Sequence, residues 1–463
     1  MGKLFGTDGV RGISNEKLGI ELAVAISRSV GTVIRADTGK RPRILLGIDT
    51  RLSGGLLSSA VSAGFASVGC DVELLGVVPT PAVAYLTAAT GADGGVMITA
   101  SHNPYEYNGI KCFGATGYKL TDEQEARIES MVLDDGNENI KSDDTEAVKI
   151  YKEKILLAAA EEVGSVTENR AAVDKYIEHI SSAIGNLEGF KIAVDCANGA
   201  SYEIAKKIFE KTGANASFIN DCPNGRNVND NCGSLHIEGL SEFVKNGGFD
   251  LGVAFDGDAD RCIAVDDKGN KMDGDVMMAI LAKRFAGEGR LCGNIFVPTI
   301  MSNMGLFKFA EKEGFTCYPT KVGDRYVLES LLKYNASLGG EQSGHIIIKD
   351  YMTTGDGELT ALLLAETVKK SKVPASELRK VMTEYPQVLE NIEATPEMKK
   401  RLDDSEVRAY INIASGRLGG EGRILVRPSG TEPLIRIMIE GSDEKKIQSL
   451  LSECAETLKN MLR

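Results

Sequence analysis

Residues 43–69 read RILLGIDTRLSGGLLSSAVSAGFASVG, and this stretch sets the pattern for most of the chain. Its first part, RILLGID (43–49), is an apolar run with the length of a buried strand. Its second part, LLSSAVSAGFASVG (56–69), spaces its apolar residues as on one face of a helix. The stretch therefore predicts a strand, a short turn and a helix.

The same pattern returns twice along the chain. KIAVDCANGA (191–200) leads into SYEIAKKIFEKTG, and GNIFVPTIMSN (293–303) leads into MGLFKFAEKEG, each a strand, a turn of small residues and a helix. This weak repeat predicts three similar mixed α/β domains whose sheets are mostly parallel.

The C-terminal part of the chain has a different pattern. It contains a strand candidate, RAYINIA (408–414), then a glycine-rich turn, GRILVRPSGTEPLIRIMIEG, and a closing amphipathic helix, DEKKIQSLLSECAETLKNML. We expect a smaller C-terminal α+β domain here. The acidic, polar segment LDDGNENIKSDDTEAVK (133–149) has the composition of a solvated loop or linker.

Composition limits the class of protein. With 463 residues, 43% hydrophobic and 26% charged, the chain is too long for one core and should form three or four domains. The net charge of −13 and the lack of a basic block argue against a nucleic-acid partner. Nine scattered cysteines without a CxxC pair predict neither a disulfide framework nor a zinc site, and they fit a reducing cytoplasm. The N-terminus does not resemble a signal peptide or a myristoylation motif, and no apolar run has the length of a membrane span.

The first candidate site is TASHNPYEYNGIK (99–111), which groups Ser101 and His102 with Asn108 and Lys111. A serine hydroxyl is a weak nucleophile without a base or a metal, but a phosphorylated serine is a donor that needs charge neutralisation. The surroundings do not match the GxSxG nucleophile elbow. Taken alone, the stretch fits a structured loop or a helix cap better than a catalytic serine.

The second candidate is DGDADR, residues 256–261. Its aspartates stand at i, i+2 and i+4, on one side of an extended segment, so they can converge on one hard cation such as Mg²⁺. An EF-hand loop needs glycine and glutamate where this chain has Arg261 and Asp267, which argues against a calcium loop. The alternative is an acidic turn in solvent, but the apolar strand LGVAF directly before it favours a site.

Two further loops carry polar groups. GGEQSGHI (339–346) places a glutamate, a serine and a histidine between glycines, as in loops that bind sugar hydroxyls, although a tight turn has the same composition. VRPSGTEPLIR (426–436) combines an arginine, hydroxyls and turn amides that suit a phosphate, or else it is an ordinary turn between strands. Together the four candidates indicate phosphoryl transfer on a phosphorylated sugar.

These motifs also carry a resemblance to a known family. FGTDGVRG (5–12), TASHNPYEYNGIK, VDCANGA (194–200), NDNCGS (229–234), DGDADR, VGDRYV (322–327), GEQSGH (340–345) and RPSGTEP (427–433) stand in the order found in the α-D-phosphohexomutase family, and the chain resembles that family over essentially its whole length. The resemblance implies three similar domains and a mobile fourth around a central active-site cleft. The domain boundaries we expect are 1–165, 166–262, 263–373 and 374–463.

The resemblance also implies roles for individual residues. Ser101 matches the serine that carries the phosphoryl group, and it would complete the coordination of one Mg²⁺ held by Asp256, Asp258 and Asp260. Sugar hydroxyls would be held by Glu341 and Ser343, and the phosphate that is not transferred by Arg427, Ser429, Gly430 and Thr431. Charged positions that line or adjoin the cleft are Arg11, His102, Lys111, Arg261, Lys321 and His345.

The implied reaction is an isomerisation of a sugar phosphate. Phosphoserine would give its phosphoryl group to the substrate, and the resulting 1,6-bisphosphate would turn over and return the other group to Ser101, with Lys111 or His102 as the base. The GTDGVRG opening and Gln342 resemble the branch that acts on glucosamine phosphates. The alternatives are a mutase for plain hexose phosphates and a catalytically silent sugar-phosphate-binding protein. The expected partner is a small sugar phosphate, not a membrane, and the resemblance leaves room for a homodimer.

Overall fold

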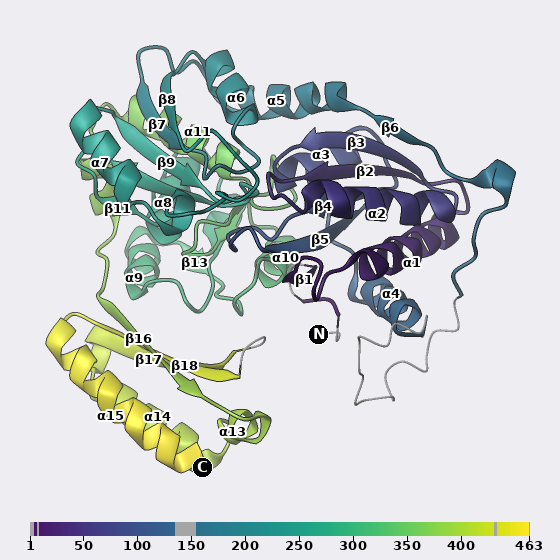
Figure 1. The fold of residues 1–463 in the computed structure, drawn as a ribbon. Helices are drawn as coiled ribbons and strands as arrows, with labels where there is room; N and C mark the ends of the chain where they lie inside the picture. Colours follow the sequence, from purple (N-terminus) through teal and green to yellow (C-terminus); the bar gives the residue numbers. More distant parts are fainter. Residues whose placement is uncertain (1–3, 7–8, 135–153, 430–432, 463) are drawn as a thin grey trace. The chain divides into compact units, whose positions relative to one another are not determined.

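The computed structural model describes residues 4–6, 9–134, 154–429 and 433–462 (Figure 1). The chain divides into two compact units. Unit 1 takes in residues 1–300 and 317–380, and unit 2 takes in residues 301–316 and 381–463. Most of the linker predicted at 133–149 lies outside the described residues.

The first sheet of unit 1 is built around the stretch 43–69. β2 is buried along most of its length and pairs in parallel with β3 and β4, which explains its continuous apolar run. The predicted helix forms as α2 and packs against α1. The strand order is β1-β5-β4-β2-β3-β6, with β5 antiparallel to β4 and to β1. The elements are β1 (Val10–Ile13), α1 (Ile20–Thr38), β2 (Arg43–Ile48), α2 (Gly54–Ser67), β3 (Asp71–Val77), α3 (Thr80–Ala89), β4 (Gly94–Ile98), β5 (Tyr107–Gly114), α4 (Asp122–Asp134) and β6 (Val166–Glu168).

The second sheet repeats the central part of this order. It runs β11-β10-β9-β7-β8, with β7 parallel to β8 and β9, and β10 antiparallel to β9. The predicted strand and helix at 191–213 form as β7 and α6, and α6 ends at Gly213 in the left-handed conformation that glycine favours. The elements are α5 (Val173–Ser181), β7 (Lys191–Asp195), α6 (Ile204–Thr212), β8 (Asn215–Ile219), α7 (Glu238–Gly247), β9 (Leu251–Phe255), β10 (Cys262–Asp266) and β11 (Lys271–Met272).

A third, smaller sheet completes unit 1. β12 is parallel to β14, and β15 is antiparallel to β14. The sheets are therefore mixed, with parallel pairs and an antiparallel strand beside them, rather than parallel throughout. The elements here are α8 (Gly274–Gly287), β12 (Ile295–Val297), α10 (Asp324–Lys333), β14 (Leu338–Gly340), β15 (Ile346–Ile348), α11 (Gly357–Ser371) and α12 (Ala375–Leu378), and the boundary between the units falls within β13 (Thr316–Cys317).

Three loops hold equivalent places in these sheets. Each joins a strand that has a parallel neighbour to the antiparallel strand beside it: β4 to β5, β9 to β10, and β14 to β15. The loops contain Ser101, the aspartates of 256–260, and GEQSGH, respectively. Each has a residue at positive φ: Ser101 (53°), Ala259 (52°) and Gly344 (91°). The repeat in the sequence thus corresponds to a repeated loop position.

Unit 2 contains a three-stranded antiparallel sheet of order β16-β18-β17 with a core of its own. The predicted closing helix forms as α15, and the helix predicted at 304–314 forms as α9 and groups with this unit. The elements are α9 (Met304–Glu313), β16 (Gln387–Glu393), α13 (Pro396–Arg401), α14 (Ser405–Gly416), β17 (Gly422–Pro428), β18 (Leu434–Gly441) and α15 (Glu444–Leu462).

One secondary-structure prediction is wrong. RAYINIA (408–414) is not a strand but lies within α14. Val407 and Ala414 are buried and Tyr410 and Ile411 pack against the same core, which is helical spacing, while Ile413 is 70% exposed. The β-branched residues suggested a strand because the window began after Val407 and so missed the start of the helical stripe.

No helix in the described ranges is long and apolar enough to cross a membrane. The domain boundaries expected at 165, 262 and 373 stay predictions.

Candidate active site

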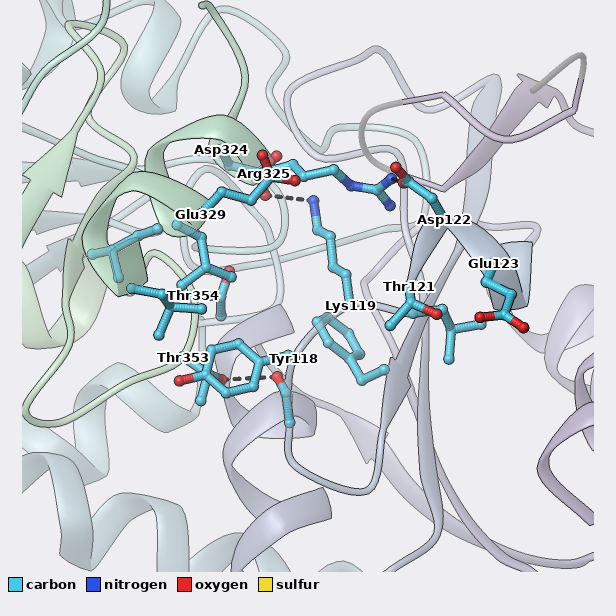
Figure 2. Close-up of a pocket in the computed structure, with 16 residues that line it drawn as sticks. Tyr118, Lys119, Thr121, Asp122, Glu123, Asp324, Arg325, Glu329, Thr353 and Thr354 are labelled. Atoms are coloured by element: carbon cyan, nitrogen blue, oxygen red, sulfur yellow. Dashed lines mark hydrogen bonds and ion pairs between the residues drawn. The ribbon is translucent and has the colours of Figure 1, made fainter. Parts of the chain in front are cut away.

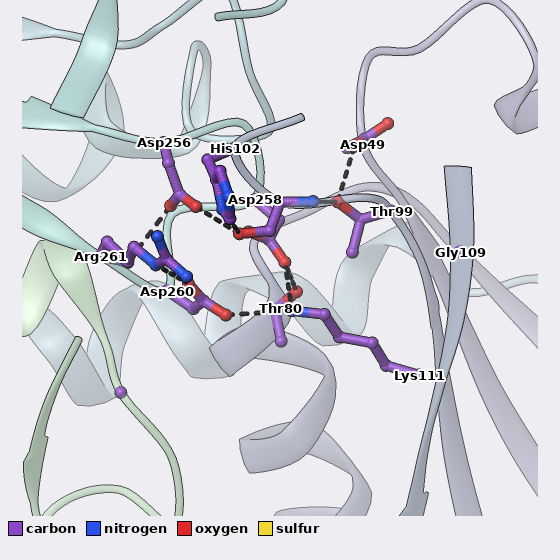
Figure 3. A network of polar contacts seen from close by, with 12 residues as sticks. Asp49, Thr80, Thr99, His102, Gly109, Lys111, Asp256, Asp258, Asp260 and Arg261 are labelled. Carbon is purple, nitrogen blue, oxygen red and sulfur yellow. Dashed lines mark hydrogen bonds and ion pairs between the residues drawn. The ribbon is translucent and has the colours of Figure 1, made fainter. Parts of the chain in front are cut away.

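Ser101 lies in the loop that follows β4, directly after Thr99 and Ala100. It is buried and adopts a φ of 53°, an uncommon conformation for a residue other than glycine. Its hydroxyl donates a hydrogen bond of 2.6 Å to Asp256 Oδ2. Figure 3 shows the polar network that contains its neighbours Thr99 and His102 from the first sheet's loop and Asp256 from the second. The serine is therefore placed directly against the aspartate loop.

The three aspartates of the second candidate loop converge as their spacing predicted. Asp256, Asp258 and Asp260 are all buried, and one ligand oxygen from each lies within 4.8 Å of the others. Burial raises the pKa of Asp256 to about 8, and the charges of Asp260 and Asp258 add to the rise. The cluster therefore carries negative charge that is unfavourable unless cations lie beside it.

Three basic side chains face this cluster. Lys111 Nζ lies 2.8 Å from Asp258 Oδ2 and 3.0 Å from Asp260 Oδ2 (Figure 3). Arg261 Nε and His345 Nδ1 lie 3.8 and 3.6 Å from Asp260 Oδ1. Although burial opposes ionisation, Lys111, His345 and Arg261 together hold the pKa of Asp260 well below its usual range. Burial alone would lower the pKa of His345, but Asp260 and its other acidic neighbours raise it.

The donor set fits a hard divalent cation. It consists of carboxylate oxygens, the ligands that Mg²⁺ prefers. Among the described residues, Asp258 Oδ1 is buried without a hydrogen-bond partner, which is costly for a carboxylate unless a cation takes that place. The aspartate triad could therefore hold a metal ion.

His102 is a neutral imidazole in this arrangement. Its pKa is lowered to about 3, mainly by burial and in addition by the charges of Arg261 and Arg11. Its Nδ1 lies 3.4 Å from Ser101 Oγ. Arg11 reaches this region from β1, where it stands opposite Gly109 of β5.

In and near the third loop, the predicted site residues differ in whether they contact the groups around Ser101. Glu341 Oε1 accepts a hydrogen bond of 2.9 Å from Gly323 N, and its charge adds to the raised pKa of His345. Ser343 and Lys321 are exposed, and Lys321 Nζ lies 5.8 Å from the ring centroid of Tyr326. Within the described part of the chain, neither of these two has a polar contact with the Ser101 cluster.

Asn108, which the sequence grouped with Ser101, has another partner. It is buried, its amide donates 2.9 Å to Ser53 Oγ, and its carbonyl accepts from Gly109 N. It therefore supports the start of β5 rather than the serine hydroxyl.

The fourth candidate loop lies in unit 2, and Gly430 and Thr431 fall outside the described residues. Arg427 on β17 stands directly opposite Arg436 on β18. Directly opposed residues of an antiparallel pair share one face, where like charges repel unless an anion lies between them. Lys399 Nζ donates 2.8 Å to the carbonyl of Ser429, the last described residue before the gap. The sequence did not single out Arg436 or Lys399, which add positive charge beside this loop.

Comparison with family models decides what kind of protein this is. Four models match in sequence order: the phosphoglucomutase/phosphomannomutase alpha/beta/alpha domains I (residues 2–139), II (174–269) and III (273–385), and the C-terminal domain (370–457). The chain belongs to the phosphohexomutase family. It is thus a phosphomutase, an isomerase, and the resemblance drawn from the sequence motifs is confirmed.

Relatives and solved structures agree with this assignment. The phosphohexomutase described here is 47% identical over its whole length to a phosphoglucosamine mutase of Acetivibrio thermocellus, which is also fully covered, and 48% identical to one of Clostridium acetobutylicum over 99% of each chain. A phosphoglucomutase/phosphomannomutase family protein of Burkholderia thailandensis has the same fold, with a TM-score of 0.80 over 99% of this chain and 97% of that one at 22% identity. An N-acetylphosphoglucosamine mutase of Aspergillus fumigatus, solved with GlcNAc-6P and magnesium, gives a TM-score of 0.67 over 99% and 96% at 17% identity.

A separate cavity of about 440 Å³ lies beside this phosphohexomutase's aspartate cluster. It is lined by residues 117–123 and by α10, with the Lys119–Asp324 ion pair on its wall (Figure 2). Asp324 Oδ2 also lies 4.0 Å from His345 Nε2. None of Ser101, Lys111 or the three aspartates lines this cavity, so it is a neighbour of the site rather than the site itself.

The sequence missed several residues that contact the two central loops. Thr80, the first residue of α3, donates through its N–H to the carbonyl of Asp258 at 2.9 Å and through its hydroxyl to the carboxylate of the same residue. Asp49 accepts a hydrogen bond from Thr99 beside the Ser101 loop (Figure 3), and Arg51 pairs with Asp49 and donates to the carbonyl of Ser101. Their position directly after a buried parallel strand is a signal that could have found them, because ligand sites form at the carboxyl ends of such strands.

Proposed function

We propose that this phosphohexomutase interconverts glucosamine 6-phosphate and glucosamine 1-phosphate through a phosphorylated Ser101 and a 1,6-bisphosphate intermediate. The observation that carries the proposal is the 2.6 Å hydrogen bond from Ser101 Oγ to Asp256 within a buried cluster of three carboxylates. The amino-sugar substrate is supported by relatives named phosphoglucosamine mutase at 47% and 48% identity.

Asp256, Asp258 and Asp260 would hold one Mg²⁺ per active site, with phosphorylated Ser101 beside them. Such an ion neutralises charge on the oxygens of a transferring phosphoryl group. Lys111, which contacts two of the aspartates, and Arg261, which lies beside Asp260, supply fixed positive charge next to the cluster. Fixed cations in a buried site stabilise developing negative charge more strongly than water does.

The proton of the attacking sugar hydroxyl needs an acceptor, and Lys111 and His102 are the candidates. Lys111 is held as an ammonium by its two ion pairs, so it would first have to lose a proton. His102 is neutral, because burial lowers its pKa to about 3. A phosphate dianion beside it would raise that pKa, since a nearby negative charge favours the imidazolium. We therefore favour His102 as the acceptor.

The remaining roles follow the same proposal. Glu341 and Ser343 would hold sugar hydroxyls, with Lys321 and His345 beside them, and Arg11 would add positive charge. In unit 2, Arg427, Ser429, Gly430 and Thr431 would grip the phosphate that is not transferred, and the opposed pair of Arg427 and Arg436 supports this role. All nine cysteines are free thiols, which supports the reducing cytoplasm as the compartment. A homodimer stays a prediction.

The test is a competition assay followed by phosphorus NMR. Purified protein is mixed with magnesium, a trace of hexose 1,6-bisphosphate and equal amounts of glucosamine 6-phosphate, glucose 6-phosphate and mannose 6-phosphate. We expect glucosamine 1-phosphate to form well ahead of the other products. Another 1-phosphate in the lead would overturn the choice of sugar, and no product at all would overturn the mutase activity in favour of a binding protein.

The Ser101→Ala variant in the same assay tests the phosphoserine. We expect turnover to fall by at least about a thousandfold, because the phosphoryl carrier is gone. Binding of glucosamine 6-phosphate, measured by calorimetry, should persist. Wild-type turnover in this variant would exclude the mechanism whatever the sugar.

A further inference from the structure

The loop that carries Ser101 is held by its backbone. Arg51 is fully buried and donates hydrogen bonds to the carbonyls of Ser101 (2.9 Å), Asn103 (2.7 Å) and Tyr107 (3.1 Å), and also to that of Pro104. Four carbonyls of one loop thus converge on one guanidinium, whose planar fork of donors suits such a set.

The guanidinium group of Arg51 is held in place by residues that follow strands of the first sheet. Arg51 Nε donates 2.8 Å to Asp49 Oδ2, and the same oxygen accepts 2.7 Å from the hydroxyl of Thr99. Thr99 Oγ1 in turn accepts 2.9 Å from Ser101 N. The N–H and the carbonyl of Ser101 are therefore both connected to the Asp49–Arg51 ion pair.

A second hydrogen-bond donor to the Ser101 loop, Asn229, lies in a loop of the second sheet. Asn229 Nδ2 donates 2.9 Å to the carbonyl of Ser101 and 3.1 Å to that of Asn103. Beside it, a Cβ on Gly257 of the aspartate loop would lie 2.6 Å from the same Ser101 oxygen, so only glycine allows this approach. The Ser101 carbonyl thus accepts hydrogen bonds from both Arg51 and Asn229 at the place where the two loops meet.

This grip acts on a strained residue. Ser101 has a φ of 53°, and a residue with a side chain keeps such a conformation only where its surroundings enforce it. If the carbonyl were released, the peptide could turn toward negative φ, and the hydroxyl would leave its position against Asp256. Neither Arg51 nor Asn229 carries a reacting group, so their contribution is the orientation of Ser101.

We propose that Arg51 and Asn229 form a two-sided clamp on the Ser101 carbonyl and are positioning residues for phosphoryl transfer. This inference rests on the proposed role of Ser101. Because the clamp binds loop carbonyls and not the sugar, its loss acts on the rate of transfer rather than on substrate binding.

The cleanest test is Asn229→Gly in the full-length enzyme. Asn229 has a φ of 57°, which glycine adopts without strain, so the change removes the amide and little else. We expect kcat to fall by about 10–100-fold with KM within about twofold of wild type. Amide hydrogen exchange over residues 99–107 should become faster, since the loop has lost a restraint.

Asn231→Gly is the matched control. Asn231 has a similar φ of 52°, is exposed, and its amide contacts only Asp230 among the described residues. We expect wild-type kcat and exchange in this variant. Arg51→Lys is a second test: lysine keeps the charge beside Asp49 but cannot reach four carbonyls, so kcat should fall further than in Asn229→Gly.

The outcomes separate the clamp from the proposed function. An inactive Ser101→Ala together with a fully active Asn229→Gly overturns the clamp alone. Equal losses in Asn229→Gly and Asn231→Gly also overturn it, because the effect then belongs to the segment and not to the contact. Wild-type turnover in Ser101→Ala removes both proposals.

Discussion

The loop from β4 to β5 and the loop from β9 to β10 occupy equivalent places in two sheets, but different groups hold them. In the Ser101 loop the carbonyls are bound by side chains, those of Arg51 and Asn229, and the serine hydroxyl donates to Asp256. In the aspartate loop the carbonyls are bound by backbone N–H groups, since Thr80 N donates to Asp258 and Gly357 N donates to Ala259. The carboxylates of Asp258 and Asp260 pair in addition with Lys111. One loop position thus presents a serine hydroxyl in one sheet and a cluster of carboxylates in the other.

The largest effect should come from the aspartate loop. Asp258→Asn removes a buried negative charge, which belongs to a proposed metal ligand, and a partner of Lys111. We expect turnover to fall at least about a hundredfold and the magnesium concentration needed for half-maximal activity to rise. A magnesium titration of the initial rate measures both, and a variant with the wild-type magnesium response would remove Asp258 from the metal site.

Asp266→Asn is the control for this variant. Asp266 is also buried, at the other end of β10, where its carboxylate accepts hydrogen bonds from Lys268 N and Asn270 N. We expect lower stability but an unchanged magnesium response. A shifted magnesium response here would mean that the loss of any carboxylate from this hairpin disturbs the site.

Much of this comparison could be predicted from the sequence. The aspartates stand at alternate positions directly after an apolar strand, and this spacing predicts their convergence. They converge from a turn with Ala259 at a φ of 52°, however, and not from an extended segment. The strand and helix at 43–69 follow from apolar length and spacing. The chemistry of each loop is visible in its residue types.

The clamp could not be predicted in this way. Asn229 lies 128 residues from Ser101 and donates to a backbone carbonyl, a group that every residue offers, so no residue pattern marks the contact. The pairing of Lys111 with Asp258, 147 residues apart, likewise needs two sheets to dock. For RAYINIA the residue pattern was present but misleading. Its residue types favour a strand, but packing against the core of unit 2 stabilises a helix.

A smaller effect, on the stability of the folded protein, is expected at Glu358, a buried residue next to a backbone contact of the aspartate loop. Gly357 N donates 3.0 Å to the carbonyl of Ala259 in that loop, and Glu358 is buried beside it. Tyr176 donates 2.8 Å and Ser201 2.7 Å to the Glu358 carboxyl. Burial raises the pKa of Glu358 to about 8, and the neighbouring Asp356 adds to the rise.

The folded protein therefore keeps a proton on Glu358 that the unfolded chain releases near pH 4.5, so stability falls as pH rises from that value through about 8. The glutamine of Glu358→Gln stays neutral at every pH, so this variant should lose less stability as the pH rises. We expect the fall in Tm between pH 6 and pH 9 to be smaller in the variant by roughly 3–6 °C, measured by thermal denaturation. Asp256, whose pKa is raised to about 8, contributes equally to both proteins. Parallel profiles would show that Glu358 is ionised in the fold.

The smallest effect should come from Thr99, which holds the Ser101 loop only at its N–H. Thr99→Val keeps the shape but removes the acceptor for Ser101 N and the donor to Asp49. The loss is about 1 kcal/mol of stability, typical of one hydrogen bond, and we expect kcat to fall about 3–10-fold at unchanged KM. Thr99→Ser restores the hydroxyl and should restore kcat.

Thr87→Val separates this effect from a general loss of buried hydroxyls. Thr87 is buried in α3 and its hydroxyl bonds only to the carbonyl of Val83 among the described residues, so its removal should lower Tm but not kcat. If Thr99→Val also lowers Tm alone, the carbonyl grip of Arg51 and Asn229 is sufficient to orient the serine. If kcat falls with it, the strained backbone at Ser101 needs restraint on both sides of the residue, and the side chains that bind the main chain of this loop set the direction of the serine hydroxyl.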